Sequence, residues 1–145
     1  MQSAGTQLDG SEILIRRVRP SSEGHQTIVE RDDSGFRATT PAMSTRGNEE
    51  HLSCSRLCLI TPRRLLNNLR NYGEDPSDGW HVCCFTVADV VDLGLEIQFT
   101  PTDEDPGHCS ITGPEGLAYP NNKAQKLARR TRILTSDEIE AMSRR

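Results

Sequence analysis

The chain has 145 residues, of which 34% are hydrophobic and 26% are charged, and its formal net charge is -4 at pH 7. This length suits a single domain with one core, and the acidic balance argues against broad nucleic-acid binding, which needs an excess of Lys and Arg. No segment approaches the apolar length needed to cross a bilayer, and the first residues lack the features of a signal peptide, so we expect a cytoplasmic protein without membrane contact.

The first third of the chain is polar apart from one clear apolar segment. Residues 1–11 carry no periodic pattern and predict a disordered N-terminal segment. The alternation in "SEILIRRVRP" predicts a strand that ends before Pro20 and carries Arg16 and Arg17 near its end. Residues 21–50 are rich in Ser, Thr, Gly and charged side chains, which predicts a long polar loop that either contains short strands or is mobile. The apolar "LSCSRLCLI" that follows is expected to reach the core.

Local capping signals predict three helices and a short C-terminal segment. In "TPRRLLNNLRNYG", Thr61 suits the N-cap and Gly73 the terminating position. In "TVADVVDLG", Thr86 suits the N-cap and Asp89 can answer the free amides of the first turn. The third helix is "NNKAQKLARRT", and residues 135–145 are expected to form a short helix or a frayed tail. The apolar face of the first helix is predicted to carry Leu65, Leu66, Leu69 and Tyr72.

The remaining apolar segments read as strands. "WHVCCFTV" is a continuous apolar run of strand length, which favours a central strand covered on both faces. "LEIQF", "HCSIT" and "RIL" are shorter strand candidates. This order of elements predicts an α+β fold in which about three helices pack on a small mixed sheet. We expect one such domain over residues 12–134.

Five segments, in order, support a resemblance to a known family. They are "LIRRVRP", "LSCSR", "WHVCCFTVADVVDLGLEI", "EDPGHCSITG" and "KAQKLARRTRIL". Together they resemble a family of small uncharacterised bacterial proteins, whose members share an Arg-rich first strand, a Leu-Ser pair, a Pro-x-His turn before a strand and a basic C-terminal helix. The family implies no activity and no cofactor, and its pattern does not include the cysteines. In this sequence the resemblance marks Arg16 or Arg17, Ser53, Gly94, Pro106 and His108.

One enzymatic hypothesis rests on the arginine and the serine. If Arg16 lies at the end of the first strand and Ser53 begins a neighbouring strand, the pair is similar to the arginine and the Ser-x-Ser of ADP-ribosyltransferase-like folds. "LSCS" supplies that spacing with Ser53 and Ser55. The resemblance implies that the arginine binds dinucleotide phosphates and that the serine positions the nicotinamide ribose. Glu115 is the candidate for the late glutamate of such enzymes, although its "GPEG" context is a turn.

Histidines and cysteines raise two further hypotheses, a metal site and a reactive thiol. Zinc needs four ligands, usually in closely spaced pairs, and here no two pairs repeat one spacing. Cys83 and Cys84 precede the cap at Thr86, where a helix N-terminus lowers a thiol pKa, but the segment looks buried and buried thiols are usually inert. We therefore expect reduced cysteines that fill the core and no metal. The candidate ligands weighed were His51, Cys54, His81, Cys83, His108 and Cys109.

Basic side chains of the last long helix and the segment after it suggest a binding surface. An acidic partner protein, the phosphates of a nucleic acid or the chain's own acidic loop at Asp103, Glu104 and Asp105 would each satisfy it. The residues of this basic patch are Lys123, Lys126, Arg129, Arg130 and Arg132.

The sequence does not contain a complete set of catalytic residues for any known reaction type. The leading hypothesis is therefore a non-catalytic module that binds or assembles with a protein partner. The alternatives are an ADP-ribosyltransferase-like protein that binds NAD through Arg16 and Ser53, and a nucleic-acid-binding accessory protein. His108 is expected to be either a pH-sensitive contact beside the acidic loop or a side chain bonded to its own turn.

Overall fold

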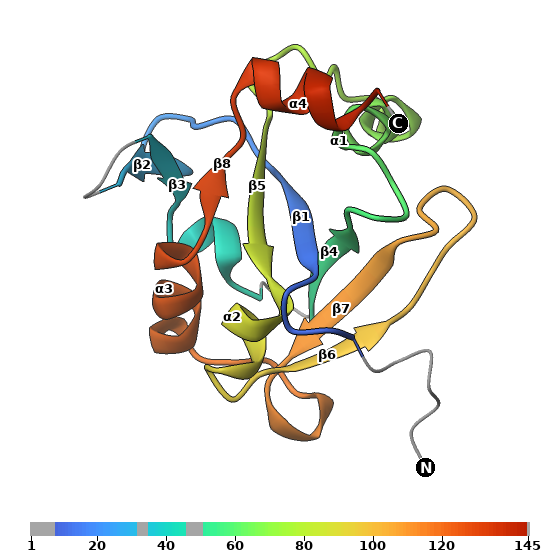
Figure 1. The fold of residues 1–145 in the computed structure, drawn as a ribbon. Helices are drawn as coiled ribbons and strands as arrows, with labels where there is room; N and C mark the ends of the chain where they lie inside the picture. The colour runs from blue at the N-terminus through green and yellow to red at the C-terminus, as the bar shows by residue number, and fades with distance from the viewer. Residues whose placement is uncertain (1–7, 32–34, 46–50, 145) are drawn as a thin grey trace.

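The computed structural model describes residues 8–31, 35–45 and 51–144, and it contains one six-stranded sheet and one two-stranded sheet (Figure 1). The larger sheet has the order β6-β7-β4-β1-β5-β8, and its neighbouring strands are antiparallel. The α+β class is confirmed, whereas the sheet is antiparallel where a mixed one was expected. The strands of this sheet are β1 (Ile13–Val18), β4 (Leu52–Arg56), β5 (His81–Thr86), β6 (Glu96–Phe99), β7 (His108–Thr112) and β8 (Arg132–Ile133).

The central strand β1 has a different relationship with each of its two neighbours. It pairs with β5 along its whole length, but with β4 only at Leu14↔Arg56 and Ile15↔Ser55. After Ile15 the ladder between β1 and β4 stops, so the β4-facing edge of the following residues is left without a strand partner. The pocket that gathers Arg16, Ser53 and His108 lies in this split.

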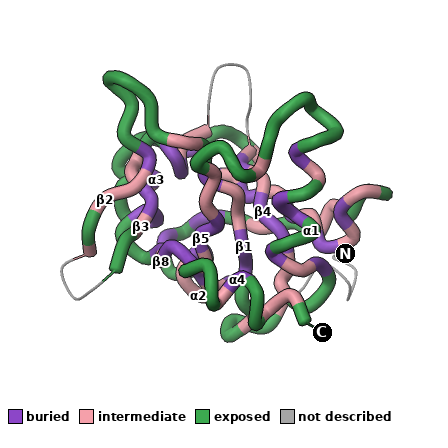
Figure 2. The backbone as a smooth tube through the Cα atoms, turned by 90° about the horizontal axis from the view of Figure 1, so that it is seen from above, coloured by how far each residue is buried: buried purple, intermediate pink, exposed green. Residues whose placement is uncertain are grey.

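Helices cover both faces of the sheet. On one face, α2 (Val87–Val91) and α3 (Asn121–Arg129) pack against Leu14 and Phe85. On the other, α1 (Pro62–Asn67) and α4 (Ser136–Met142) pack against Ile15 and Val82. Figure 2 shows the buried backbone concentrated in the strands and the exposed backbone in the outer turns. Both faces of β1 are therefore core, which explains why Leu14 and Ile15 are fully buried.

The capping signals act as predicted. The Thr61 hydroxyl accepts a hydrogen bond from the Arg64 amide, and Thr86 forms a capping box with Asp89. Tyr72 does not lie on the buried face of its helix, as was expected, and is 60% exposed. The reason is that α1 ends at Asn67 and continues as a tighter 3-10 helix, η3 (Asn68–Tyr72), which turns the tyrosine outward.

Within residues 21–50, the described parts 21–31 and 35–45 contain short strands, which was one of the two predicted alternatives for this polar loop. They contain the hairpin of β2 (Ile28–Glu30) and β3 (Phe36–Ala38) and the 3-10 helix η2 (Pro41–Met43). Ala38 and Met43 are completely buried. Residues 32–34 and 46–50 of the predicted loop lie outside the described residues.

The two ends of the described chain are also attached to the domain. The expected disorder of residues 1–11 is wrong for residues 8–11, because Leu8 packs on the core and the Gly10 carbonyl accepts from the Ala88 amide at 2.9 Å. Residues 1–7 lie outside the described residues. At the other end, α4 begins at a capping box of Thr135 and Glu138. In the described part of the chain, no helix is long and apolar enough to cross a membrane.

Thr131 fastens the β2–β3 hairpin to the main sheet, and its removal tests that role. Its fully buried hydroxyl accepts from the Ala38 amide at 2.9 Å and donates to the Ala128 carbonyl at 2.7 Å. Thr131→Val leaves the Ala38 amide buried without a partner, so we expect a loss of about 1–3 kcal/mol in the free energy of unfolding, measured with urea.

The matched control is Thr112→Val on β7, since the Thr112 hydroxyl has no hydrogen bond to another described residue. This control should change the free energy of unfolding by less than about 0.5 kcal/mol. Equal urea midpoints for the wild type and Thr131→Val would show that the hairpin is not held in this way.

Candidate functional site

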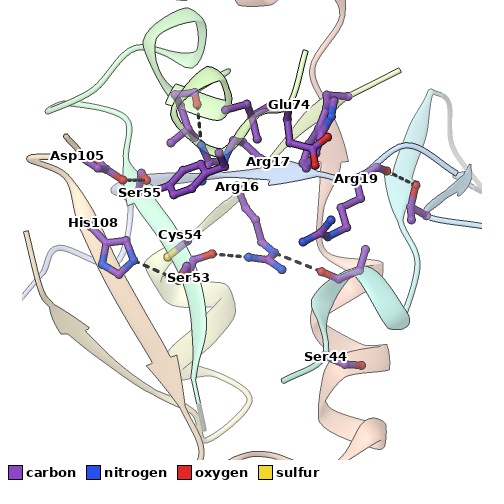
Figure 3. A pocket seen from close by; sticks show the side chains of 16 residues that line it. Arg16, Arg17, Arg19, Ser44, Ser53, Cys54, Ser55, Glu74, Asp105 and His108 are labelled. Carbon is purple, nitrogen blue, oxygen red and sulfur yellow. Dashed lines mark hydrogen bonds between the residues drawn. The ribbon is translucent and has the colours of Figure 1, made fainter. Parts of the chain in front are cut away.

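The split between β1 and β4 opens into a pocket of about 460 Å³ (Figure 3). Three arginines of the N-terminal strand segment, Arg16, Arg17 and Arg19, line it. The same pocket contains Ser53 and His108, so the structure gathers the three site candidates that are far apart in the sequence. The remaining polar and aromatic side chains of the lining are Thr27, Ser44, Ser55, Tyr72, Glu74, Trp80 and Asp105.

Arg16 spans the split. Its Nε donates to the Ala42 carbonyl at 3.2 Å and its Nη1 donates to the Ser53 carbonyl at 2.7 Å, so one guanidinium joins β1 to both β4 and η2 (Figure 3). Burial lowers the pKa of Arg16 below its ordinary value. An arginine stays charged at neutral pH even so. Nη2 of Arg16 forms no hydrogen bond with another described residue. This edge of the guanidinium can therefore donate to a ligand in the pocket.

The other two arginines are held at the wall of the pocket. Arg17 donates through Nη1 to the Leu65 carbonyl at 3.0 Å, and burial lowers its pKa as well. Arg19 lies over the ring of Trp80, with 5.7 Å between the guanidinium carbon and the ring centroid. Such a contact fixes the cation without removing its charge. The pocket therefore presents three positioned cations.

His108 connects two strands and aims one nitrogen at Ser53. Its Nδ1 lies 2.9 Å from the Thr100 hydroxyl and 3.1 Å from the Thr100 carbonyl, and its Nε2 lies 3.1 Å from the Ser53 hydroxyl. A carbonyl oxygen only accepts, so this contact favours the proton of the neutral ring on Nδ1. Nε2 then accepts from the Ser53 hydroxyl. The imidazole thus bonds Thr100 and Ser53, whereas His108 contacts its own turn through its backbone amide, which donates to the Asp105 carbonyl at 3.2 Å.

The sequence contains no local signal for the Ser53–His108 pair. The two residues are 55 positions apart, and they meet because the register of β4 and β7 sets Ser55 opposite His108 and Ser53 two positions further along. That register depends on long-range strand pairing. Ser53 and His108 could each be selected from the sequence, but their contact could not be predicted from it.

The acidic loop has its own partners. The buried Asp105 carboxylate accepts from the Ser55 hydroxyl and from the Gly107 amide, the latter at 2.9 Å. Glu104 accepts through its carboxylate from Tyr72 and Asn71 of η3. The acidic loop therefore contacts η3 and β4. The prediction that this loop could bind the basic patch is wrong, because its carboxylates have these other partners.

Three of the five basic-patch residues are engaged within the domain. Lys123 donates to the Leu93 carbonyl at 2.7 Å, and Arg130 lies 3.4 Å from both Asp89 and Asp92. Arg132 pairs with Glu138 at 2.7 Å. The other two residues of the patch, Lys126 and Arg129, are exposed, and their side chains have no hydrogen bond or ion pair with another described residue.

Three of the five cysteines, Cys54, Cys83 and Cys109, are core residues. Cys54 and Cys109 are buried directly opposite each other on β4 and β7. Burial raises the pKa of Cys83 to about 12, and burial also raises the pKa of the half-buried Cys84. Among residues 8–31, 35–45 and 51–144, no three His, Cys, Asp or Glu side chains gather to hold a metal ion. This concerns all six candidate ligands, His51, Cys54, His81, Cys83, His108 and Cys109.

Comparison with known proteins does not identify the chain. No family model, curated protein or solved structure matches it. Of the ADP-ribosyltransferase-like set, Arg16 and Ser53 lie together, whereas Glu115 lies in the turn η4 (Pro114–Gly116) and does not line the pocket.

The burial of Cys83 predicts that it is chemically silent in the folded protein. With a pKa of about 12 it remains a thiol at pH 8, and no solvent reaches it. We expect iodoacetamide to alkylate the exposed Cys58 first and to modify Cys83 only after unfolding, as measured by peptide mass spectrometry. Alkylation of Cys83 in the native protein at a rate similar to that of Cys58 would contradict the burial.

The hydrogen bonds of His108 predict one tautomer of its neutral ring. We expect nitrogen-15 spectra recorded where the imidazole is neutral to show a protonated Nδ1 and an unprotonated Nε2, because Nδ1 faces the Thr100 carbonyl. The reverse assignment would mean that His108 donates to Ser53 and does not accept from it.

Proposed function

We propose that the protein binds a small phosphorylated ligand of the nucleotide class in the pocket between β1 and β4. The observation that carries the proposal is the convergence of Arg16, Arg17 and Arg19 on one cavity beside the Ser53 hydroxyl. Guanidinium groups match the geometry of phosphate oxygens and remain charged when partly buried. Only the carboxylates of Glu74 and Asp105 oppose them in the lining, and that of Asp105 is already bonded to Ser55.

The size and lining of the pocket support a ligand larger than a free phosphate. Pockets for small ligands fall in the range of roughly 300–1,000 Å³, and this one measures about 460 Å³. Tyr72 and Trp80 offer aromatic surfaces on which a base can stack. Ser44 and Ser53 offer hydroxyls for ribose or phosphate oxygens.

A pyridine dinucleotide is the first ligand to test, because Arg16 and Ser53 share one pocket as the ADP-ribosyltransferase-like hypothesis requires. The proposal stops at binding, since Glu115 is not part of the lining. The reduced state of all five cysteines is consistent with action in the cytoplasm of a bacterial cell.

Assembly with a protein partner through the basic patch, the leading hypothesis from the sequence, has less support than the pocket. Arg130 and Arg132 already pair with carboxylates of the same domain, so an acidic partner would have to displace them. The same holds for a nucleic acid.

The binding proposal predicts a thermal shift. At a hundredfold excess over its dissociation constant, a ligand stabilises the folded state by about 2.7 kcal/mol, which for a chain of this size raises Tm by roughly 5–10 °C. We expect NAD or ADP-ribose to produce such a shift and orthophosphate to produce a smaller one. Arg19→Ala should reduce the shift, because Arg19 lines the pocket, and among the described residues its guanidinium contacts Trp80 and forms no ion pair.

Two further variants complete the test. Arg16→Lys keeps the positive charge but cannot reach both carbonyls, so we expect a lower Tm without ligand and no ligand shift. Arg129→Ala, on the exposed face of α3, should retain the full shift. Equal shifts in the wild type, Arg16→Lys and Arg19→Ala, or no shift with any of the three ligands, would refute the proposal.

A further inference from the structure

Beyond ligand binding, the pocket contains a hydrogen-bonded pair formed by the Ser53 hydroxyl and the His108 imidazole. A serine hydroxyl becomes a nucleophile when a base accepts its proton and a third group orients that base. Here the base is Nε2 of His108, 3.1 Å from the Ser53 hydroxyl, and the orienting group is the Thr100 carbonyl, 3.1 Å from Nδ1. The three groups come from β4, β7 and the end of β6, so rigid strands hold the arrangement in place.

The electrostatic surroundings suit the charge that develops during acyl transfer. Arg16 Nη1 is bonded to the carbonyl of Ser53 itself, which fixes a guanidinium beside the nucleophile. A cation at that position can stabilise the oxyanion of a tetrahedral intermediate. Arg17 and Arg19 remain to hold an anionic group elsewhere on the same ligand.

We infer that Ser53 and His108 form a nucleophilic couple that hydrolyses a carboxylic ester whose acyl or alcohol part carries a phosphate or carboxylate group. This inference rests on the proposed function for the binding of that anionic group.

The reaction balances without a cofactor. The Ser53 oxygen attacks the ester carbonyl carbon while its proton moves to Nε2 of His108. The bond from the carbonyl carbon to the alcohol oxygen then breaks, and the alcohol leaves with the proton from Nε2. Water attacks the acyl-serine, giving its proton to His108, and the collapse releases the carboxylic acid and restores the Ser53 hydroxyl.

A fluorophosphonate probe tests the couple without knowledge of the natural substrate. The serine oxygen displaces fluoride from phosphorus and leaves a stable phosphonyl adduct. We expect intact-protein mass spectrometry to show one adduct per chain and peptide analysis to place it on Ser53. His108→Gln should slow the labelling by roughly 10²–10⁴-fold, the range that a general base contributes.

The matched control is Ser136→Ala. Ser136 is an exposed serine in the first turn of α4 and does not line the pocket, so this variant should label at the wild-type rate. Ser53→Ala should form no adduct. Thermal unfolding of each variant, with and without ADP-ribose, separates loss of the nucleophile from loss of the fold.

The outcomes distinguish the two proposals. A ligand-induced thermal shift without an adduct on Ser53 refutes the nucleophile and leaves the binding proposal intact. An adduct on Ser53 that depends on His108, without any ligand shift, supports the couple and refutes nucleotide binding. An adduct at another residue, or equal labelling rates for the wild type and His108→Gln, overturns the inference.

Discussion

The Arg16 guanidinium is the contact on which the site depends. Where β1 and β4 stop pairing, the Ser53 carbonyl of β4 has no partner on β1, and Arg16 donates to it and to the Ala42 carbonyl of η2. A buried polar group without a hydrogen bond costs about 1–3 kcal/mol, so the arginine offsets much of what the split would otherwise cost. The same residue that stabilises the opening also places a cation in it. Arg16 therefore stabilises the fold at this point and also supplies a positive charge to the pocket.

This arrangement explains why the chemistry gathers at the middle of the sheet. Because β1 is covered on both faces, its arginines can reach solvent only where a neighbouring strand withdraws. The β4–β7 register brings His108 to the same opening, and the Ser55–Asp105 bond holds the turn before β7 against β4. Long-range pairing thus assembles a pocket from segments that are unremarkable in isolation.

Local signals were sufficient to predict most elements of the fold. The helices at Thr61, Thr86 and Thr135 could be predicted because a cap involves only neighbouring residues. Tyr72 could not be placed, since a regular α-helical periodicity does not reveal the change to a 3-10 helix or the hydrogen bond from Tyr72 to Glu104, 32 positions away. Residues 21–50 were difficult for a similar reason, because the β2–β3 hairpin is held by Thr131, about a hundred positions away.

The site was only half predictable. Arg16, Ser53 and His108 could be selected by type and position, but their meeting follows from strand register, which no short segment encodes. The most direct test of the account is a titration with ADP-ribose followed by NMR of the arginine Nε–H groups and the backbone amides. We expect shifts at Arg16 Nε–H and at the Ser53 amide, with the amides of α3 unchanged. Shifts confined to α3, or an unchanged Arg16 signal at saturating ligand, would contradict it.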